Sequence, residues 1–495
     1  MQKNNIPAID QLLQSEPERL DEMCRTGERW RLDVARIPVG LSRWQAAFDT
    51  AALADVGKAL DDLFQGRMVN VSEHRPALHM AYRAPDPSSL LSGSDLALVS
   101  AGRASMLDTA RELFEGRSPV RVLLHVGIGG SDLGPRLVAG ALDSGRSAVR
   151  VEWLTTLDSR RIRRLLEELD PATTGMVIAS KSFSTVETLE QAAVIREWLG
   201  RGMEQRCWAA TANPQKALEF GIAPSRILAF PEWLGGRFSL WSGIGLSAAA
   251  RIGPDQWQAM LGGAADADQA IRRAPRQSPA LVLARAFDLL VRDLGFNTLG
   301  VVSYEPGLRL LSEFLQQLIM ESLGKSVTSK GLPVDGPTSP LVFGGAGTDL
   351  QHSLFQALHQ GTTRHPMLLL GTLECDETLA GWQDEQLANL LGQASVLARG
   401  RAADDGHRRL PGNNPVMILL ARRLDAAAVG ELLANLEHAV YLMGHFWKIN
   451  PFDQWGVEEG KRLAGAFGQA LRGRCDCPDR SFDNTLEWVA GKRKF

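Results

Sequence analysis

Short apolar runs that alternate with helical segments constrain the fold of this chain more than any other feature. Between residues 121 and 230 such runs are separated by stretches in which apolar residues recur at helical spacing. The five runs are Arg121–Val126, Val149–Leu154, Gly175–Ser180, Arg206–Thr211 and Arg226–Phe230. Short, mostly apolar runs are typical of strands that are buried on both faces. The alternation therefore predicts an α/β fold, in which helices cover both faces of a parallel sheet.

The same pattern starts again after residue 297. Strands are predicted at Thr298–Tyr304, Leu341–Phe343, Pro366–Gly371 and Pro415–Ala421. Helices are predicted at Leu308–Leu323, Asp349–Gln360, Glu377–Leu397 and Asp425–Phe446. We therefore expect two α/β domains in series. No short-period repeat is present, which excludes solenoids and coiled coils.

Residues 1–100 look different, because they are rich in loops and carry amphipathic helical stretches at Ile9–Thr26 and Leu53–Phe64. We expect an N-terminal helical segment at residues 1–100 that packs on the large domain. A first α/β domain is expected at residues 101–285. A second is expected at residues 286–495 and includes a C-terminal tail.

The charge is nearly balanced, with 54 Lys and Arg against 57 Asp and Glu. A general attraction to nucleic acid or to an anionic membrane is therefore not expected. The five cysteines are Cys24, Cys207, Cys375, Cys475 and Cys477. An odd, scattered set without a C-x-x-C pair favours reduced thiols. The first residues lack an apolar signal core, and no apolar run is long enough to span a bilayer, so a cytoplasmic protein is expected.

Two loops at predicted strand ends are suited to binding an anion. Gly127–Gly134 (GIGGSDLG) contains glycines that leave backbone amides open, and Ser180–Thr185 (SKSFST) holds four hydroxyls and a lysine. Ligands of open α/β sheets bind at the carboxyl ends of strands, where loops lead into helices. Either loop alone could be a structural turn or a helix cap. Two of them on one sheet favour a phosphate site.

Neither common nucleotide motif fits these loops. G-x-G-x-x-G fails because Asp132 stands at its last position, and a Walker A motif ending at Ser326 would need glycine in place of Ile319. A small phosphorylated metabolite therefore fits better than a dinucleotide or a triphosphate. The histidines near residue 352 lack the spacing of a zinc site, so no metal is expected.

Other polar residues could complete an active site, although spacing alone does not bring them together. Arg237 follows two glycines, and Gln317 and Glu321 share one helix face. His352 follows a glycine-rich stretch, and Lys461 lies where a loop becomes a helix. Each also has an ordinary reading, since a glutamate on a helix face is more often solvated than catalytic. Spacing alone supports only a phosphate-binding α/β enzyme.

Four longer motifs carry a resemblance to a known family. They are VGIGGSDLGP at Val126–Pro135, SKSFSTVET at Ser180–Thr188, GGRFSLWSGIGL at Gly235–Leu246 and INPFDQWGVEEGK at Ile449–Lys461. In this order they resemble the glucose-6-phosphate isomerase (phosphoglucose isomerase) family. The resemblance implies two flavodoxin-like, sugar-isomerase type α/β/α domains with parallel sheets. It also implies an aldose–ketose isomerase of glycolysis and gluconeogenesis that interconverts glucose 6-phosphate and fructose 6-phosphate without cofactor or metal.

The resemblance also assigns substrate contacts by position. The residues expected to hold the phosphate are Ser180, Lys181 mainly through its backbone, Ser182, Thr185 and Thr188. Those expected near the sugar are Gly130, Ser131, Gln317 and Gln454, with Glu187 as a supporting carboxylate.

Four residues are expected to be catalytic by the same resemblance. Glu321 matches the glutamate that moves the proton between C1 and C2, which requires one base that takes the proton and returns it. Arg237 matches the arginine beside the negatively charged enediolate. His352 matches the ring-opening histidine, which in this family reaches the partner subunit's site in a homodimer, and Lys461 matches the lysine near the ring oxygen.

The segment before His352 departs from the family pattern. Gly345, Asp349 and Leu350 stand where glutamate, asparagine and glycine are usual, which leaves the loop geometry and the sugar preference open. Two other functions remain possible at this point. One is a non-catalytic sugar-phosphate sensor, which would not need the catalytic set. The other is an isomerase–transaldolase relative that acts on another sugar phosphate, such as mannose 6-phosphate.

Overall fold

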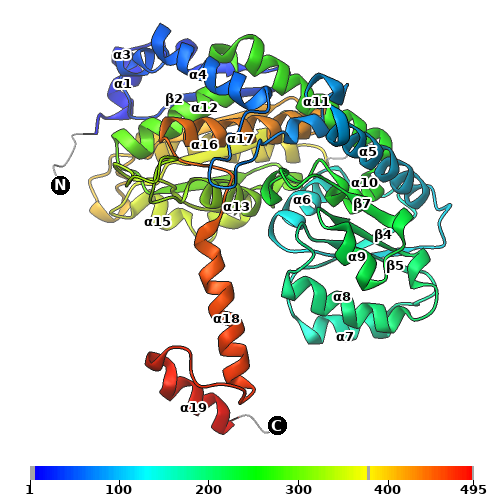
Figure 1. Ribbon diagram of the computed structural model, residues 1–495. Coiled ribbons are helices and arrows are strands. Elements are labelled where there is room, and N and C mark those ends of the chain that lie inside the picture. Colours follow the sequence, from blue (N-terminus) through cyan, green and yellow to red (C-terminus); the bar gives the residue numbers. More distant parts are fainter. Residues whose placement is uncertain (1–5, 376–378, 493–495) are drawn as a thin grey trace. The chain divides into compact units, whose positions relative to one another are not determined.

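The computed structural model describes residues 6–375 and 379–492 and divides the chain into two compact units. The first unit, Met1–Pro451, contains both sheets, and the second is Phe452–Phe495. The units are considered separately, and Figure 1 labels the elements of each.

The first sheet has five parallel strands in the order β4-β3-β5-β6-β7. They are β3 (Val122–Val126), β4 (Arg150–Leu154), β5 (Thr174–Ala179), β6 (Cys207–Thr211) and β7 (Ile227–Ala229), which confirms the five predicted strands. Counted along the chain, this is the 2-1-3-4-5 order of flavodoxin-like sheets. The order reverses between the paired strands β3 and β5. The loops that follow these two strands therefore lie where such sheets bind ligands.

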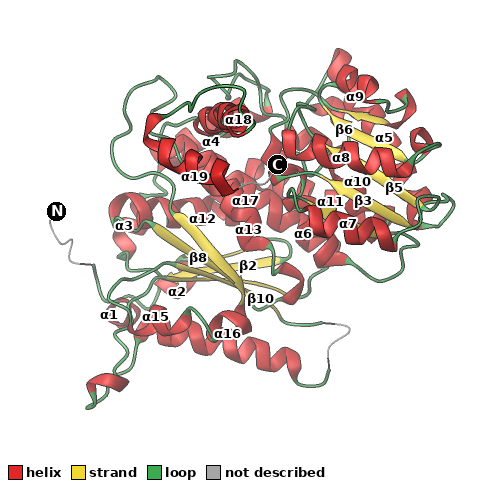
Figure 2. Cartoon of the chain, turned by 90° about the horizontal axis from the view of Figure 1, so that it is seen from below, coloured by secondary structure: helices red, strands yellow, loops and turns green. Residues whose placement is uncertain are grey.

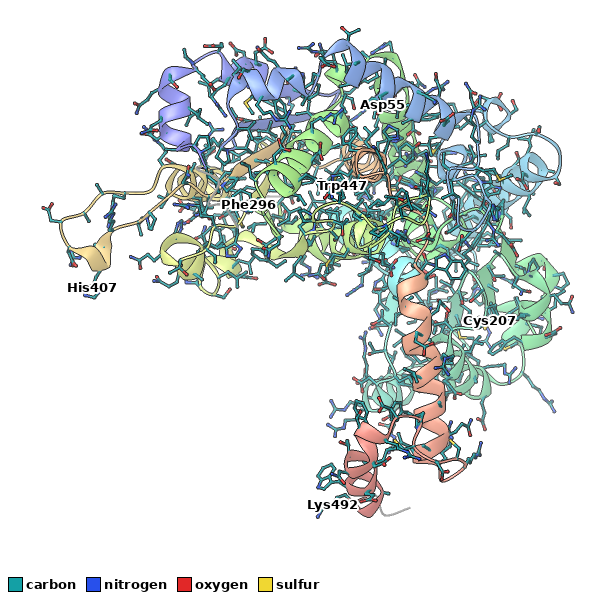
Figure 3. The ribbon with its side chains drawn as sticks, turned by 60° about the vertical axis from the view of Figure 1, so that its left-hand side comes forward. Asp55, Cys207, Phe296, His407, Trp447 and Lys492 are labelled. Carbon is teal, nitrogen blue, oxygen red and sulfur yellow. The ribbon has the colours of Figure 1, made fainter. Side chains whose placement is uncertain are left out.

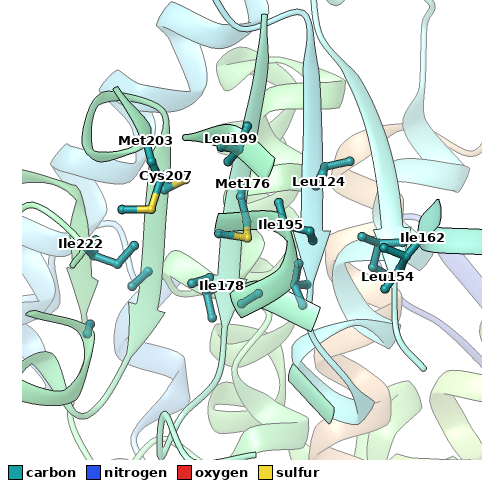
Figure 4. Packing of buried hydrophobic residues seen from close by; sticks show 14 of the residues in the cluster. Leu124, Leu154, Ile162, Met176, Ile178, Ile195, Leu199, Met203, Cys207 and Ile222 are labelled. Atoms are coloured by element: carbon teal, nitrogen blue, oxygen red, sulfur yellow. The ribbon is translucent and has the colours of Figure 1, made fainter. Parts of the chain in front are cut away.

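Helices cover both faces of the first sheet. One face carries α7 (Ser159–Glu168), α8 (Val186–Leu199) and α9 (Pro214–Phe220), and the other carries α5 (Gly93–Phe114), α6 (Leu133–Leu142) and α10 (Leu246–Ile252). Leu124, Met176 and Ile178 pack against the first set, and Cys207 is buried in the same core (Figure 4). Every residue of β5 is buried. This explains why the strands appear in the sequence as unbroken apolar runs.

The second sheet has six strands in the order β1-β2-β11-β10-β8-β9. Its parallel strands are β8 (Thr298–Ser303), β9 (Leu341–Ala346), β10 (Met367–Thr372) and β11 (Val416–Ala421), which confirms the four predicted strands. Their order repeats that of the first four strands of the first sheet. β2 (Trp30–Arg36) takes the fifth place, antiparallel to β11, and β1 (Cys24–Thr26) pairs with β2. The N-terminal residues therefore complete the second sheet.

The prediction of helices and loops for residues 1–100 was wrong at these two strands. The stretch Ile9–Thr26, expected to be helical, divides into α1 (Ile9–Ser15), α2 (Arg19–Glu22) and β1. The strand β2 finds its partner only near the other end of the chain, so its neighbours in sequence do not reveal the pairing. This segment also contains α3 (Leu41–Ala46), α4 (Thr50–Phe64), which was expected, and the start of α5.

Helices also cover both faces of the second sheet (Figure 2). One face carries α1, α15 (Phe355–Gln360) and α16 (Trp382–Arg399), and the other carries α12 (Pro279–Asp288), α13 (Leu311–Leu323) and α17 (Ala426–Phe446). The helix expected at Asp349–Gln360 is two helices, α14 (Gly347–Gln351) and α15. The helix expected from Glu377 is described from Trp382, and residues 377–378 lie outside the described residues.

The helix α17 is the central helix of the first unit and packs on α11 (Pro254–Arg273). Asp425 begins α17 by accepting a hydrogen bond from the Ala428 amide, as an N-cap residue does. At its other end lies Trp447, which Figure 3 labels. Its indole donates to Asp288 Oδ1 at 2.8 Å, which connects α17 to α12. A side chain at Gly430 would collide with the Met260 carbonyl, so glycine lets the two helix backbones touch.

The second unit contains α18 (Glu458–Leu471) and α19 (Asp483–Lys492). Neither helix has a buried residue. All five cysteines of the chain, which lie among the described residues, are free thiols.

Candidate active site

The loop after β3 is a tight turn without side-chain bulk. Gly129–Ser131 forms a 3-10 turn before α6, and Gly129 has φ +59°, a conformation that favours glycine. A side chain at Gly130 would collide with the Gly236 carbonyl. A side chain at Gly129 would approach the Gln317 amide nitrogen. This loop therefore touches two other segments of the site through its backbone.

The loop after β5 presents hydroxyls beside a helix N-terminus. Ser182 and Ser184 are exposed, and the Ser184 hydroxyl donates to Ser182 Oγ at 2.7 Å. Thr185 is the N-cap of the 14-residue α8, and its side chain makes no capping bond, so the first amides of α8 remain available to a ligand. Thr188 is buried one turn further on, and Glu187 is exposed beside it.

Lys181 is held at this loop by its own backbone. Its carbonyl accepts hydrogen bonds from the Ala212 amide at 2.9 Å and from the Thr211 hydroxyl at 3.0 Å. Burial lowers the pKa of the Lys181 ammonium, although Glu73 nearby opposes the shift. A partly desolvated cation beside several hydroxyls suits an anionic ligand.

Arg237 is buried and fixed by three neighbours. Its Nε donates to Ser322 Oγ at 2.7 Å, and one terminal nitrogen donates to the Pro451 carbonyl at 2.5 Å. The other terminal nitrogen lies 3.4 Å from the Glu321 carboxylate. The guanidinium therefore has a defined orientation before any ligand binds.

Glu321 lies on α13, facing the same space. Its side chain is 31% exposed, and its Oε2 accepts a hydrogen bond from the Gln317 amide at 3.3 Å. Gln317 is four residues earlier on the same helix, and it is also the group that approaches Gly129. The structure thus brings together four predicted residues from three segments, Gly130, Arg237, Gln317 and Glu321.

His352 is an exposed residue that caps the C-terminus of α14. Its ring makes no hydrogen bond to the described residues, and its backbone amide donates to the Asp349 carbonyl. Two residues of the preceding strand have backbone angles that favour glycine, Gly344 at φ +155° and Gly345 at φ +150°. The glycine at position 345 therefore matches the local backbone.

Lys461 and Gln454 belong to the second unit. Lys461 lies on α18 with an exposed side chain, and its ammonium donates to Glu458 Oε1 at 2.8 Å. Gln454 is exposed, and its carbonyl accepts a hydrogen bond from the Val457 amide.

Three contacts of the site were not predicted from the sequence. Ser322 and the Pro451 carbonyl orient Arg237, and the Lys325 ammonium donates to the Glu321 carbonyl at 2.5 Å. Ser322 and Lys325 follow Glu321 within the segment Glu321–Lys325 (ESLGK), and this closeness in sequence was the available signal. The Pro451 carbonyl has no signal in the sequence, because any residue supplies a carbonyl.

Among the described residues, no helix is both long and apolar enough to cross a membrane. The same residues hold no group of three or more His, Cys, Asp or Glu side chains arranged to bind a metal ion.

Comparisons of sequence and of structure with known proteins give consistent results. A family model described as phosphoglucose isomerase matches residues 40–485. The glucose-6-phosphate isomerase of Stenotrophomonas maltophilia (strain R551-3) is 42% identical over 470 residues, which are 94% of this chain and 92% of that protein. That of Xylella fastidiosa (strain 9a5c) is 40% identical over 471 residues, with the same coverage of both. A crystal structure of a glucose-6-phosphate isomerase from Chlamydia trachomatis D/UW-3/Cx is 29% identical, with a TM-score of 0.86 over 98% of this chain and 96% of that one.

Proposed function

The chain belongs to the phosphoglucose isomerase family, and we propose that it interconverts glucose 6-phosphate and fructose 6-phosphate without a cofactor. The proposed route is ring opening followed by proton transfer through a cis-enediolate. The observation that carries the proposal is the Glu321 carboxylate 3.4 Å from the fixed Arg237 guanidinium, beside the glycine turn of the first sheet.

The phosphate is held by the loop after β5 and by the first turn of α8. Hydroxyls and helix amides bind a phosphate without a metal. The Lys181 carbonyl is already occupied, so the backbone contribution of this residue is its amide. The proposed phosphate contacts are Ser180, Lys181, Ser182, Thr185 and Thr188. The proposed sugar contacts are Gly130, Ser131, Glu187, Gln317 and Gln454.

Proton transfer between C1 and C2 is assigned to Glu321. One carboxylate can take the proton from one carbon and return it to the next, because both carbons lie on the same face of a cis-enediolate. Arg237 stabilises the negative charge that develops on the enediolate oxygens. It does so more than it stabilises the neutral sugar, which is the condition for catalysis.

Ring opening is assigned to His352 and Lys461. Histidine can donate and accept a proton near neutral pH. The exposure of His352 supports a role in the site of a second subunit, so the active form is a homodimer with shared sites. Sedimentation at micromolar concentration tests this part, and an active monomer would contradict it.

The proposed domain boundaries are residues 1–100, 101–285 and 286–495, although β1 and β2 of the first segment join the second sheet. The proposed location is the cytoplasm, and the proposed pathways are glycolysis and gluconeogenesis. The parallel strands of the two sheets span residues 122–229 and 298–421, which supports the division at about residue 285.

A coupled assay of fructose 6-phosphate conversion tests the reaction. Glu321→Gln should reduce kcat by about 10³-fold or more, because the amide cannot accept the proton at the required rate. Glu313→Gln is the matched control, since Glu313 lies on the same helix but contacts Arg136 on α6. Full turnover by Glu321→Gln, or none by the wild type, would refute the assignment.

Two further measurements separate the alternatives. Incorporation of solvent deuterium at C2 of the product supports the enediolate route over a hydride shift. Parallel assays with mannose 6-phosphate measure the breadth of substrates. Binding of hexose phosphates by calorimetry without any turnover would instead identify a sugar-phosphate sensor.

A further inference from the structure

A buried histidine lies directly below the glycine turn of the site. His125 is on β3, is fully buried, and is two residues before Gly127. One ring nitrogen, Nε2, lies 2.7 Å from the Ser131 carbonyl, and the other, Nδ1, lies 2.8 Å from the Ser247 hydroxyl of α10. The mechanism proposed above assigns no role to this residue.

The partners of the ring define its protonation state. A carbonyl oxygen only accepts, so His125 Nε2 carries the hydrogen and donates to Ser131. Burial lowers the pKa of His125 to about 4, although the bond to Ser131 opposes the shift, so the ring is neutral at physiological pH. In the neutral ring Nδ1 has no hydrogen and accepts from the Ser247 hydroxyl. The two hydrogen bonds therefore run in one direction: Ser247 donates to His125, and His125 donates to the Ser131 carbonyl.

The second of these hydrogen bonds ends on the Gly129–Ser131 turn, which borders the site. Ser131 ends the 3-10 turn Gly129–Ser131, whose backbone touches Gly236, Arg237 and Gln317. At Gly129 and Gly130 the turn has no side chain between its backbone and these neighbours, so a shift of the turn moves them. Arg237 and Gln317 are the two residues that contact the Glu321 carboxylate.

A polar side chain at position 125 lowers the stability of the fold unless it has a compensating role. The strand β3 is covered on both faces, and its neighbours in sequence are Leu124 and Val126, both fully buried. A buried imidazole costs free energy unless its nitrogens are hydrogen-bonded. Both nitrogens are bonded here, and one of the bonds ends on the site.

We propose that His125 is a positioning residue, which fixes the Gly129–Ser131 turn against Arg237 and Gln317 through its hydrogen bond to the Ser131 carbonyl. This inference rests on the proposed isomerase function. His125 does not touch the substrate, and its effect passes through the turn.

The test compares His125→Gln with His125→Asn. The Gln amide nitrogen reaches about the position of Nε2, whereas the Asn amide is too short to reach the Ser131 carbonyl. We expect His125→Asn to lower kcat by about 10- to 100-fold, the loss caused by misplacing a site by a fraction of an ångström to one ångström. His125→Gln should recover most of it. KM should change less than about threefold in both, because the phosphate loop on β5 is untouched.

A further readout separates positioning from a loss of folded protein. A stable mimic of the enediolate, a five-carbon aldonohydroxamic acid phosphate, should bind His125→Asn more weakly in proportion to kcat/KM. A smaller folded fraction would lower kcat but leave this affinity unchanged. Equal behaviour of the Gln and Asn variants, or an unchanged affinity for the mimic, would overturn the role of His125.

Amide hydrogen exchange tests the same inference without turnover. Peptides covering residues 127–132 should exchange faster in His125→Asn than in His125→Gln or the wild type, and equal exchange would overturn the inference. If the wild type does not convert hexose phosphates, the proposed function fails, whereas the exchange result still decides whether His125 holds the turn.

Discussion

The contact between Gly130 and the Arg237 turn makes a quantitative prediction. A Cβ at position 130 would lie 2.7 Å from the Arg237 amide nitrogen and even closer to the Gly236 carbonyl. The nitrogen must move by about 0.7 Å to reach the 3.4 Å of an ordinary contact. The obstacles are backbone atoms, so rotating a side chain cannot relieve the contact. The Gly130→Ala variant therefore displaces the Gly129–Ser131 turn or the Arg237 turn by up to about one ångström.

A displacement of this size at the reacting groups lowers kcat/KM by about 10²-fold, or about 2.7 kcal/mol of transition-state stabilisation. The loss should appear in kcat rather than in KM, because the loop proposed to hold the phosphate follows a different strand, β5. Gly140→Ala is the control, since Gly140 lies on the following helix α6 and a Cβ there meets nothing within 4 Å. The coupled assay on both variants checks the prediction. Activity of Gly130→Ala within a factor of two of the wild type would refute the backbone-contact reasoning.

Two other predictions concern buried polar groups. Ser322→Ala removes the oxygen that accepts a hydrogen bond from Arg237 Nε, and it should lower kcat/KM by about tenfold. Ser322→Thr keeps this oxygen and should lose less. Equal losses of kcat/KM in the two variants, measured in steady-state assays, would contradict the prediction. Burial alone would raise the pKa of Asp268, but Arg83 and His438 lower it to about 2. Its stabilising effect is therefore complete above pH 4 and is lost as the pH falls to 2, by about 2 kcal/mol. Urea unfolding should show this slope in the wild type but not in Asp268→Asn, and parallel curves would refute it.

The nine parallel strands were predictable because their signal is local. Strands buried on both faces must be apolar throughout, so β5 and β10 are recognisable without knowledge of their partners. The strand β2 alternates buried and partly exposed residues and pairs across nearly the whole chain. Local sequence could not assign it, because the information lies in the pairing with β11.

The site was predictable to the extent that it consists of side chains in motifs. Arg237 and Glu321 were identified by resemblance, and the structure adds that they meet. The contacts that orient them are partly backbone contacts, such as the Pro451 carbonyl and the Gly130 backbone. A carbonyl is identical in every residue, so no sequence pattern marks the Pro451 contact. Gly130 was marked by its motif, but the motif does not show that its backbone touches the Arg237 turn. The role of His125 was not predicted either, because a histidine within an apolar strand does not indicate which groups its ring nitrogens bond.

The strand order is repeated in the two sheets, but the proposed phosphate site lies on the first sheet alone. In the first sheet, the loops after β3 and β5 offer open amides and hydroxyls. In the second sheet the matching strands are β8 and β10. Glu305 stands in the loop after β8, and Thr372 is the last residue of β10. The Glu305 carboxylate accepts from the Thr372 hydroxyl at 2.6 Å and from the Gly307 amide at 3.0 Å. A buried carboxylate thus occupies the hydrogen-bond donors that a phosphate would need, and its charge repels an anion. These contacts favour the single phosphate site proposed for the first sheet, and α13, which packs on the second sheet, carries Glu321.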